Sequence, residues 1–416
     1  MSSVSPGLDG RPGASFAELG LPAALVARLA ERGIRQPLAI QAGTIADALA
    51  GRDVCGKAPT GSGKTLAFSL PVAARVSKSS PKRPRALVLA PTRELAAQIA
   101  EELAFLLEVR GLRVHAFYGG TGFGAQLDAL RRGTDVAVAC PGRLEDLMAR
   151  GDIRLGEVET VVLDEADRMA DMGFLPAVRR ILDATPPGRQ TLLFSATLDG
   201  EVDVLVRRYQ DDPVVHEVQP PVDALATARH RFHEVDRADR VSACAELVGG
   251  LGSSIIFVRT KHGADRLARQ LKGRGVSAGV LHGGRTQGQR ERTLREFKTG
   301  RIATLVATDV AARGIHVDGV DGVIHFDLPA DAKDYIHRSG RTARAGAAGT
   351  VVALVTDDQY DAAVALEKAV PVRISGLARR ASMPAPAASR PTAPSARTAR
   401  RRRRPSGGGR SGRAGE

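Results

Sequence analysis

Long apolar runs are absent from this 416-residue sequence, and its start lacks the pattern of a secretion signal. No uncharged apolar stretch reaches 18 residues, which excludes a membrane-spanning helix of ordinary length. The first 13 residues are polar and rich in glycine and proline, with neither a basic region nor an apolar core, so we expect no signal peptide. We therefore expect a cytoplasmic protein.

Cysteine is also scarce. The three cysteines, Cys55, Cys140 and Cys244, lie far apart and form no CxxC pair. This spacing argues against a disulfide framework and against a zinc site. We interpret them as buried apolar thiols in a reducing compartment.

Acidic residues are nearly missing from the end of the chain. From Gly376 to Glu416 there are eleven arginines and one acid, so this tail carries +10 of the formal net charge of +14. Its Ala, Pro, Ser, Arg and Gly composition cannot build a core, and we predict a disordered arm that binds polyanions. A solubilising tail without a partner remains the alternative.

Apolar residues make up 43% of the chain, enough to form cores, and they recur in short runs followed by helical periodicity. This alternation is typical of parallel sheets covered on both faces, and no solenoid-type repeat is visible. The expected strands of a first domain are 54–55, 86–90, 114–117, 136–139, 161–163 and 191–194. Those of a second domain are 255–258, 279–281, 304–306, 323–326 and 351–355.

A proline-containing segment without clear periodicity separates the two sets of strands. We therefore predict an α/β fold with two tandem parallel-sheet domains joined by a linker. The predicted boundaries are a disordered start (1–14), a first domain (15–215), a linker (216–229), a second domain (230–373) and the basic tail (374–416).

A glycine-rich loop follows the first predicted strand and precedes a helix. Gly61 and Gly63 would let backbone N–H groups close around phosphate oxygens, Lys64 would reach the β and γ phosphates, and the Thr65 hydroxyl would hold magnesium. Ala58 stands where the phosphate-loop motif has glycine. The predicted nucleotide-binding loop comprises Ala58, Thr60, Gly61, Ser62, Gly63, Lys64 and Thr65.

An acidic pair, Asp164-Glu165, closes the strand at 161–163 and should lie at the carboxyl edge of the same sheet, where open α/β sheets bind ligands. Asp164 suits a place in the coordination sphere of magnesium. Glu165 suits polarisation of an attacking water.

These features resemble those of the DEAD-box RNA helicases. Residues 164–167 spell Asp-Glu-Ala-Asp, and further segments resemble family motifs in family order up to about Gly346. They are 16 with 33–41, 91–95, 119–120, 141–143, 195–197, 256–257, 287 with 290, 307–314 and 337–346. The resemblance implies two RecA-like domains and an ATP-dependent enzyme that remodels RNA without reading its base sequence. The alanine- and arginine-rich composition suggests a high-GC bacterial source.

The resemblance also implies roles for individual residues. Gln41 would pair with the adenine edge and Phe16 would stack on the base, or else Phe16 is a core residue. Arg341 and Arg344 resemble arginine fingers that reach the γ-phosphate from the second domain, where Asp309 is a further ATP-binding candidate. The candidates for domain coupling are Ser195, Thr197, Asp167 and His337. The candidates for RNA contact are Pro91, Thr92, Arg93, Gly119, Gly120, Pro141, Gly142, Arg143, Gln287, Arg290 and Thr308.

Three positions depart from the family pattern. Leu38 replaces a threonine of the adenine-reading motif, and we expect it to weaken the link of that motif to the phosphate loop. Cys140 replaces a threonine before Pro141 and removes a hydroxyl that could meet a phosphate. His316 replaces an aspartate that contacts ribose, unless Asp318 does the same work.

Other functions are compatible with some of these features. An ATP-gated RNA clamp would carry the same motifs and differ in slow product release. A passive RNA chaperone acting through the tail is disfavoured by the intact catalytic set, and DNA unwinding is disfavoured by the RNA-helicase resemblance. Because contacts to the RNA backbone carry no sequence code, the target RNA does not follow from the sequence. Ribosomal or RNA-degrading assemblies are candidate partners.

Overall fold

The structure is a computed structural model, and it describes residues 14–59, 61–218, 227–312, 317, 319–343 and 349–377. Residues 1–13 of the predicted start, residues 378–416 of the predicted tail, most of the predicted linker, Thr60, His316, Asp318 and Arg344 lie outside these residues. No helix within the described ranges is both long and apolar enough to cross a membrane.

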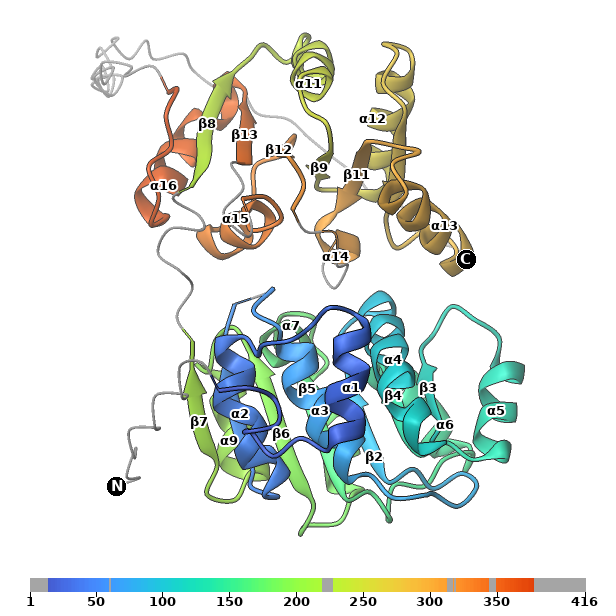
Figure 1. Cartoon of the computed structure of the whole chain (residues 1–416). Coiled ribbons are helices and arrows are strands. Elements are labelled where there is room, and N and C mark those ends of the chain that lie inside the picture. The colour runs from blue at the N-terminus through green and yellow to red at the C-terminus, as the bar shows by residue number, and fades with distance from the viewer. Residues whose placement is uncertain are drawn as a thin grey trace, which may run out of the picture. The chain divides into compact units, whose positions relative to one another are not determined.

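The first domain is built on a seven-stranded parallel sheet in the order β3-β4-β2-β5-β6-β1-β7 (Figure 1). Its strands are β1 (Val54–Lys57), β2 (Ala86–Leu89), β3 (Val114–Phe117), β4 (Val136–Ala139), β5 (Thr160–Asp164), β6 (Gln190–Ser195) and β7 (Val214–Glu217). The six strands predicted for this domain are confirmed. The seventh, β7, was not predicted because its residues are only half buried and alternate with exposed ones.

Helices cover both faces of this sheet, and alternate residues of one strand serve the two sides. Ala86 and Val88 of β2 belong to the core under α1 to α4, whereas Leu87 and Leu89 belong to the core under α5 to α9. The helices are α1 (Ala23–Glu31), α2 (Ala39–Leu49), α3 (Lys64–Arg75), α4 (Arg93–Leu107), α5 (Phe123–Arg132), α6 (Pro141–Ala149), α7 (Ala166–Asp171), α8 (Leu175–Asp183) and α9 (Glu201–Tyr209). Burial on both faces explains why the strands are short apolar runs.

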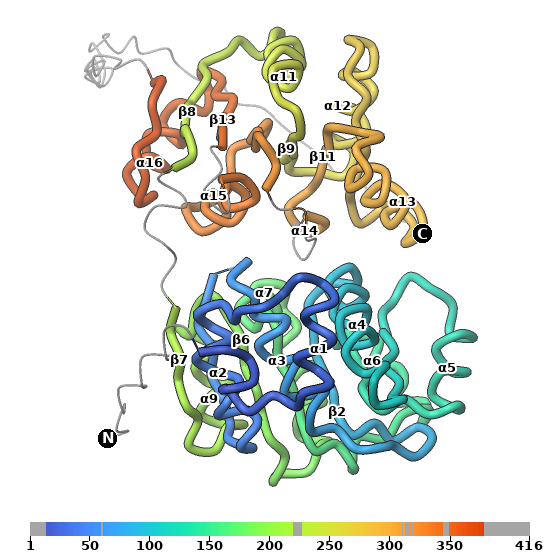
Figure 2. Tube along the Cα trace, viewed as in Figure 1, coloured from blue at the N-terminus to red at the C-terminus, as the bar shows by residue number. Residues whose placement is uncertain are grey.

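The second domain has a six-stranded parallel sheet in the order β10-β11-β9-β12-β13-β8, and the course of the chain through this domain can be followed in Figure 2. Its strands are β8 (Ala228–Glu234), β9 (Ser254–Val258), β10 (Ala278–Leu281), β11 (Thr304–Thr308), β12 (Gly322–His325) and β13 (Gly349–Val355). One core lies under α11 (Arg240–Gly249) and α12 (Lys261–Lys272). The other lies under α13 (Gln287–Lys298), α14 (Asp309–Ala312), α15 (Ala332–Ser339) and α16 (Tyr360–Ala369).

The two sheets have the same strand order, except that the first has β7 added beside β1. Counted in chain order, β1 to β6 of the first domain correspond to β8 to β13 of the second. The match extends to details, since Thr92 after β2 and Thr260 after β9 both cap the following helix by accepting a backbone N–H.

The predicted domain boundaries need correction at three points. β7 pairs with β1 up to Glu217, so the first domain extends past residue 215. β8 pairs with β13 from Ala228, before the predicted start at residue 230. The prediction placed this start too late because exposed arginines alternate with buried residues along β8 and make it look like a charged segment. Ser375 bridges to Arg231, so the second domain continues past residue 373.

Candidate functional site

The predicted phosphate-binding loop, called the phosphate loop below, lies between β1 and α3, at the carboxyl edge of the first sheet. Gly61 and Gly63 have φ angles of 83° and 89°, in the left-handed region that favours glycine. A side chain on Gly63 would also collide with the Gln41 amide. These two glycines allow the sharp turn that aims the start of α3 into the loop.

Lys64 is buried and its ammonium closes the loop on itself. Nζ donates to the carbonyl oxygens of Ala58, at 2.7 Å, and Pro59, at 3.4 Å, while the Ser62 hydroxyl donates to the Pro59 carbonyl at 2.8 Å. Phosphate oxygens are stronger acceptors for an ammonium than these carbonyls because they are charged. The loop carbonyls thus hold the Lys64 ammonium in place, and a phosphate group would be a stronger acceptor for it. Thr65, the expected magnesium ligand, is half buried at the start of α3.

The acidic pair ends β5 two strands away from β1, with β6 between them. Asp164 is 3% exposed, and Glu165 has a φ of 51°, an uncommon conformation for a residue that is not glycine. Burial, followed by the charge of Glu165, raises the pKa of Asp164 to about 7, and Lys64 opposes this rise. The Oε2 atom of Glu165 is buried and has no hydrogen-bond partner among the described residues. A carboxylate left in this state suits a cation and a water molecule as partners.

Ser195 joins the acidic pair to the phosphate loop. Its hydroxyl accepts a hydrogen bond from the backbone N–H of Asp167 at 3.2 Å, and its carbonyl accepts one from the backbone N–H of Ala58 at 3.0 Å. One residue at the end of β6 thus touches both halves of the site. Thr197, two residues further on, is half buried.

Gln41 makes the link to the phosphate loop that Leu38 was expected to weaken. Its Nε2 donates to the Gly63 carbonyl at 3.0 Å, and its Oε1 accepts from the Leu38 backbone N–H at 2.9 Å. The amide still has one N–H and one lone pair free, enough to pair with an adenine edge. Phe16 is 1% exposed in the core of the first domain, which favours the core role for this residue.

The predicted RNA-contact residues of the first domain gather where β2, β3 and β4 end. Gly120 has a φ of 80°, and a side chain there would collide with the Arg93 guanidinium. Arg143 is buried, donates to the Thr121 carbonyl at 3.1 Å and lies 4.1 Å from the centre of the Phe123 ring. Burial lowers its pKa. Thr92, Pro91 and Pro141 are also buried, whereas Gly120 and Gly142 are exposed.

Cys140 is half buried and caps α6 without a side-chain hydrogen bond, whereas Cys55 and Cys244 are fully buried. Burial raises the pKa of all three thiols to about 12. They are therefore protonated at neutral pH and poor nucleophiles.

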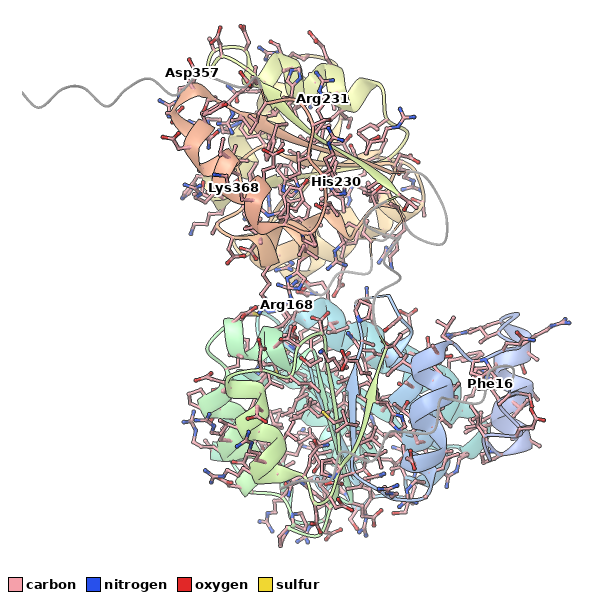
Figure 3. The ribbon with its side chains drawn as sticks, turned by 90° about the vertical axis from the view of Figure 1, so that its left-hand side faces the viewer. Phe16, Arg168, His230, Arg231, Asp357 and Lys368 are labelled. Atoms are coloured by element: carbon pink, nitrogen blue, oxygen red, sulfur yellow. The ribbon has the colours of Figure 1, made fainter. Side chains whose placement is uncertain are left out.

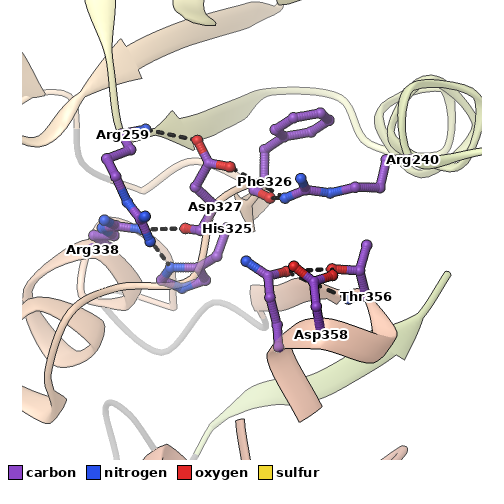
Figure 4. A network of polar contacts seen from close by, with 9 residues as sticks. Arg240, Arg259, His325, Phe326, Asp327, Arg338, Thr356 and Asp358 are labelled. Atoms are coloured by element: carbon purple, nitrogen blue, oxygen red, sulfur yellow. Dashed lines mark hydrogen bonds and ion pairs between the residues drawn. The ribbon is translucent and has the colours of Figure 1, made fainter. Parts of the chain in front are cut away.

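In the second domain, Asp309 is held by an arginine that the sequence analysis did not single out. Arg338 donates to both carboxylate oxygens of Asp309, at 2.6 and 2.7 Å, and to the carbonyl of Asp327 at 2.8 Å. Figure 4 shows Arg338 beside His325 and the backbone of Asp327. Arg341, one turn further on, is 4% exposed, and His337 lies on the same helix as Arg338. The signal available in the sequence was the repeated arginine spacing at 338, 341 and 344.

Two RNA-contact candidates of the second domain are engaged with carboxylates. Arg290 forms an ion pair with Glu94 of α4 at 2.8 Å, and both side chains are under 10% exposed. Gln287 donates to Glu291 at 3.0 Å. Thr308 is buried at the end of β11. Arg290 therefore contacts protein here, and Glu94 is a partner that the sequence analysis missed although it lies inside the segment 91–95.

Two family models match the chain: "DEAD/DEAH box helicase" over residues 38–205 and "Helicase conserved C-terminal domain" over residues 239–346. The ATP-dependent RNA helicase RhlB of Pseudomonas putida is 43% identical over 333 residues, which are 77% of this chain and 84% of that protein. The mitochondrial DEAD-box ATP-dependent RNA helicase 9 of Arabidopsis thaliana is 40% identical over 378 residues. The chain spans 62% of the length of that plant relative.

Among solved structures, S. cerevisiae Dbp5 bound to RNA and ADP BeF3 superposes with a TM-score of 0.77 at 31% identity. The match covers 87% of this chain and 95% of the yeast chain.

Proposed function

Because this chain belongs to the DEAD-box helicase family, we propose that it is an RNA-dependent ATPase that locally unwinds RNA duplexes and remodels RNA–protein complexes. The observation that carries this proposal is the joining of the phosphate loop and the acidic pair by Ser195 at one sheet edge. That arrangement suits hydrolysis of a nucleoside triphosphate, and RNA as the partner follows from the family.

The buried Asp164 and the unpartnered Oε2 of Glu165 fit a site for magnesium and ATP. Thr65 and Asp164 would hold the ion, partly through water, and the ion would supply positive charge to the phosphate oxygens. Lys64 would transfer its hydrogen bonds from the loop carbonyls to phosphate oxygens. Gln41 would form hydrogen bonds to the adenine edge with its remaining N–H and lone pair.

Glu165 would orient the attacking water and accept its proton, since its carboxylate is buried at the end of β5 with an acceptor atom to spare. Arg341 and Arg344 would then stabilise the charge that develops on the transferred phosphoryl group. Because those arginines belong to the second domain and Lys64 to the first, hydrolysis would require both domains to act on one nucleotide. Asp167, Ser195, Thr197 and His337 would couple this closure to the phosphate site.

RNA would be held by its backbone along the ends of β2, β3 and β4 and by Gln287, Arg290 and Thr308 of the second domain. Contacts to phosphate and 2′-hydroxyl groups read shape and leave base sequence unread. Arg290 would have to exchange Glu94 for a phosphate, or keep that ion pair and contact RNA through neighbouring groups. If ATP tightens RNA binding, then RNA must tighten ATP binding by the same factor.

The test is the ATPase rate of the full chain with no nucleic acid, with single-stranded RNA and with single-stranded DNA of the same sequence. We expect stimulation by RNA alone, over many turnovers. Glu165→Gln should abolish turnover, whereas Glu101→Gln, an exposed carboxylate on α4, should leave it unchanged. Equal stimulation by DNA would refute the choice of RNA, and a single turnover per RNA-bound chain would support a clamp.

A further inference from the structure

Strand β8 presents arginines on one face and core residues on the other. Ala228, His230 and Phe232 are buried, and Arg229 and Arg231 between them are exposed. Successive side chains of a strand point to opposite faces, so both arginines lie on one face of the sheet. Figure 3 views the side of the second domain that carries β8, with Arg231 labelled.

A third arginine joins this face from the end of the described chain. Ser375 pairs in parallel with Arg231, and its backbone N–H donates to the His230 carbonyl at 3.1 Å. In a parallel register this pairing sets Arg373 beside Arg229. The burial pattern agrees, because Ile374 is buried while Arg373 and Ser375 are exposed.

The corresponding face of the first domain is covered. There α1 and α2 precede β1 on the side of the sheet that matches α11 and α12, and Asp47 of α2 contacts His216 of β7 at 2.8 Å. In the second domain no described helix precedes β8. No described helix therefore covers the arginine face, because the second domain lacks a described counterpart of these two helices.

Within the described part of the chain, the positive charge on this face has no carboxylate partner. None of Arg229, Arg231 and Arg373 forms an ion pair with another described residue, and Arg231 contacts the His233 ring at 3.3 Å. Burial and the charge of Arg231 lower the pKa of His233, and Glu246 of α11 opposes this shift. His233 therefore contributes no charge at neutral pH. Three unpaired guanidinium groups on an open sheet edge suit the phosphate groups of a polyanion.

The arginine-rich tail begins immediately after this edge. Its eleven arginines start at Arg379, four residues beyond the Ser375 bridge. The chain thus leaves the folded domain beside Arg229, Arg231 and Arg373, which makes the edge and the tail continuous in the covalent chain.

We propose that Arg229, Arg231 and Arg373 form a second RNA-binding surface, outside the helicase core, that holds the backbone of the same RNA as the tail. The surface lies at the β8 end of the sheet, whereas the core RNA contacts of this domain follow β10 and β11 at the other end. It adds an anchor for RNA that extends beyond the core, and it goes beyond the proposed ATPase function because it needs no nucleotide.

Charged side chains on an edge strand have another use, which is to prevent pairing with the edge of a second molecule. In that role the arginines would repel a second molecule and would bind no RNA. An acidic protein is a second partner that the same charge would attract.

The experiment measures binding of a labelled single-stranded RNA, longer than the core can cover, to the full chain without nucleotide over a series of salt concentrations. The test variant is Arg229→Gln, Arg231→Gln and Arg373→Gln together. The control changes Arg131, Arg180 and Arg207 to glutamine, since each is exposed and already paired with a carboxylate at 2.6–2.7 Å. Both variants lose three positive charges.

We expect the test variant to flatten the slope of log affinity against log salt by up to about 2, at about 0.7 for each lost phosphate contact. The control variant should change this slope by less than about 0.7, the value for one phosphate contact. An unchanged slope in the test variant, or an equal change in both, would overturn the proposal. Self-association of the test variant with an unchanged slope would assign the arginines to edge protection, and loss of polyglutamate binding with unchanged RNA binding would assign them to an acidic protein. Because ATP is absent, absence of ATPase activity would leave this result intact.

Discussion

Replacing Asp164 by asparagine should stabilise the nucleotide-free protein, and the gain should grow with pH. Burial raises the pKa of this carboxyl from 3.8 to about 7, with the charge of Glu165 as the next cause. A folded-state pKa above the unfolded value means that folding favours the protonated acid. The contribution of the Asp164 carboxyl to the free energy of unfolding is therefore fully present below pH 3.8 and is lost as the pH rises through about 7.

The size of the effect follows from this shift. At pH 5 the wild type has lost roughly 1.6 kcal/mol relative to the protonated state, and above pH 7 it has lost roughly 4 kcal/mol, at about 1.36 kcal/mol per unit. Asparagine does not titrate, so the advantage of Asp164→Asn should increase by roughly 2.7 kcal/mol between pH 5 and pH 8. For a domain of this size, that corresponds to a rise of roughly 5–10 °C in the difference between the melting temperatures.

The assay is thermal unfolding of wild type and Asp164→Asn at pH 5 and pH 8, with Glu101→Gln as the exposed control. Adding ATP and magnesium should reverse the order at pH 8, because the ionised Asp164 then has a cation as its partner. A difference in melting temperature that stays constant from pH 5 to pH 8 would refute the reasoning. It would show that the attraction of Lys64 for the charged carboxylate offsets the effects of burial and of the Glu165 charge, which favour the protonated acid.

Three further predictions concern turnover, the tail and the ribose contact. Glu165→Gln should abolish ATP turnover but keep ATP-dependent RNA binding, whereas Lys64→Ala should weaken nucleotide binding itself; a Glu165→Gln protein whose RNA binding no longer responds to ATP would contradict the role of this residue. Deleting residues 376–416 should weaken RNA binding and flatten its salt dependence by about 0.7 per lost contact, with the saturated ATPase rate nearly unchanged; an unaltered slope would show that the tail does not touch RNA. His316→Asp should tighten ATP binding roughly tenfold, about 1.4 kcal/mol, by restoring a charged acceptor for the ribose hydroxyls; if it has no effect while Asp318→Ala weakens binding of ATP but not of 2′,3′-dideoxy-ATP, the contact has moved to Asp318.

The strands that carry the candidate site could be predicted because they are buried on both faces. Residues such as Val161 to Leu163 form a continuous apolar run, and the polar residues that follow mark the sheet edge. β7 and β8 were missed because they lie at sheet edges and alternate exposed residues with half-buried ones in β7 and with buried ones in β8. In β8 two of the exposed residues are arginines, and such a charged sequence is more typical of a loop than of a strand.

The meeting of the glycine-rich loop and the acidic pair at one sheet edge was predictable from the sequence, but the hydrogen-bond partners there were not. The loss of a threonine at Leu38 pointed to a weak link with the phosphate loop, whereas the structure makes that link through Gln41 and the Gly63 carbonyl. The pairing of Arg290 with Glu94 joins residues 196 positions apart along the chain. Such partners depend on how the folded elements meet, which no local pattern encodes.

The shared strand order of the two sheets has a consequence for stoichiometry. The loop that corresponds to the phosphate loop connects β8 to α11 and consists of Val235, Asp236, Arg237, Ala238 and Asp239. It contains no glycine to open the backbone, and its two carboxylates would repel phosphate. The first sheet thus carries a glycine-rich loop at this position and the second does not, so each chain should bind a single nucleotide.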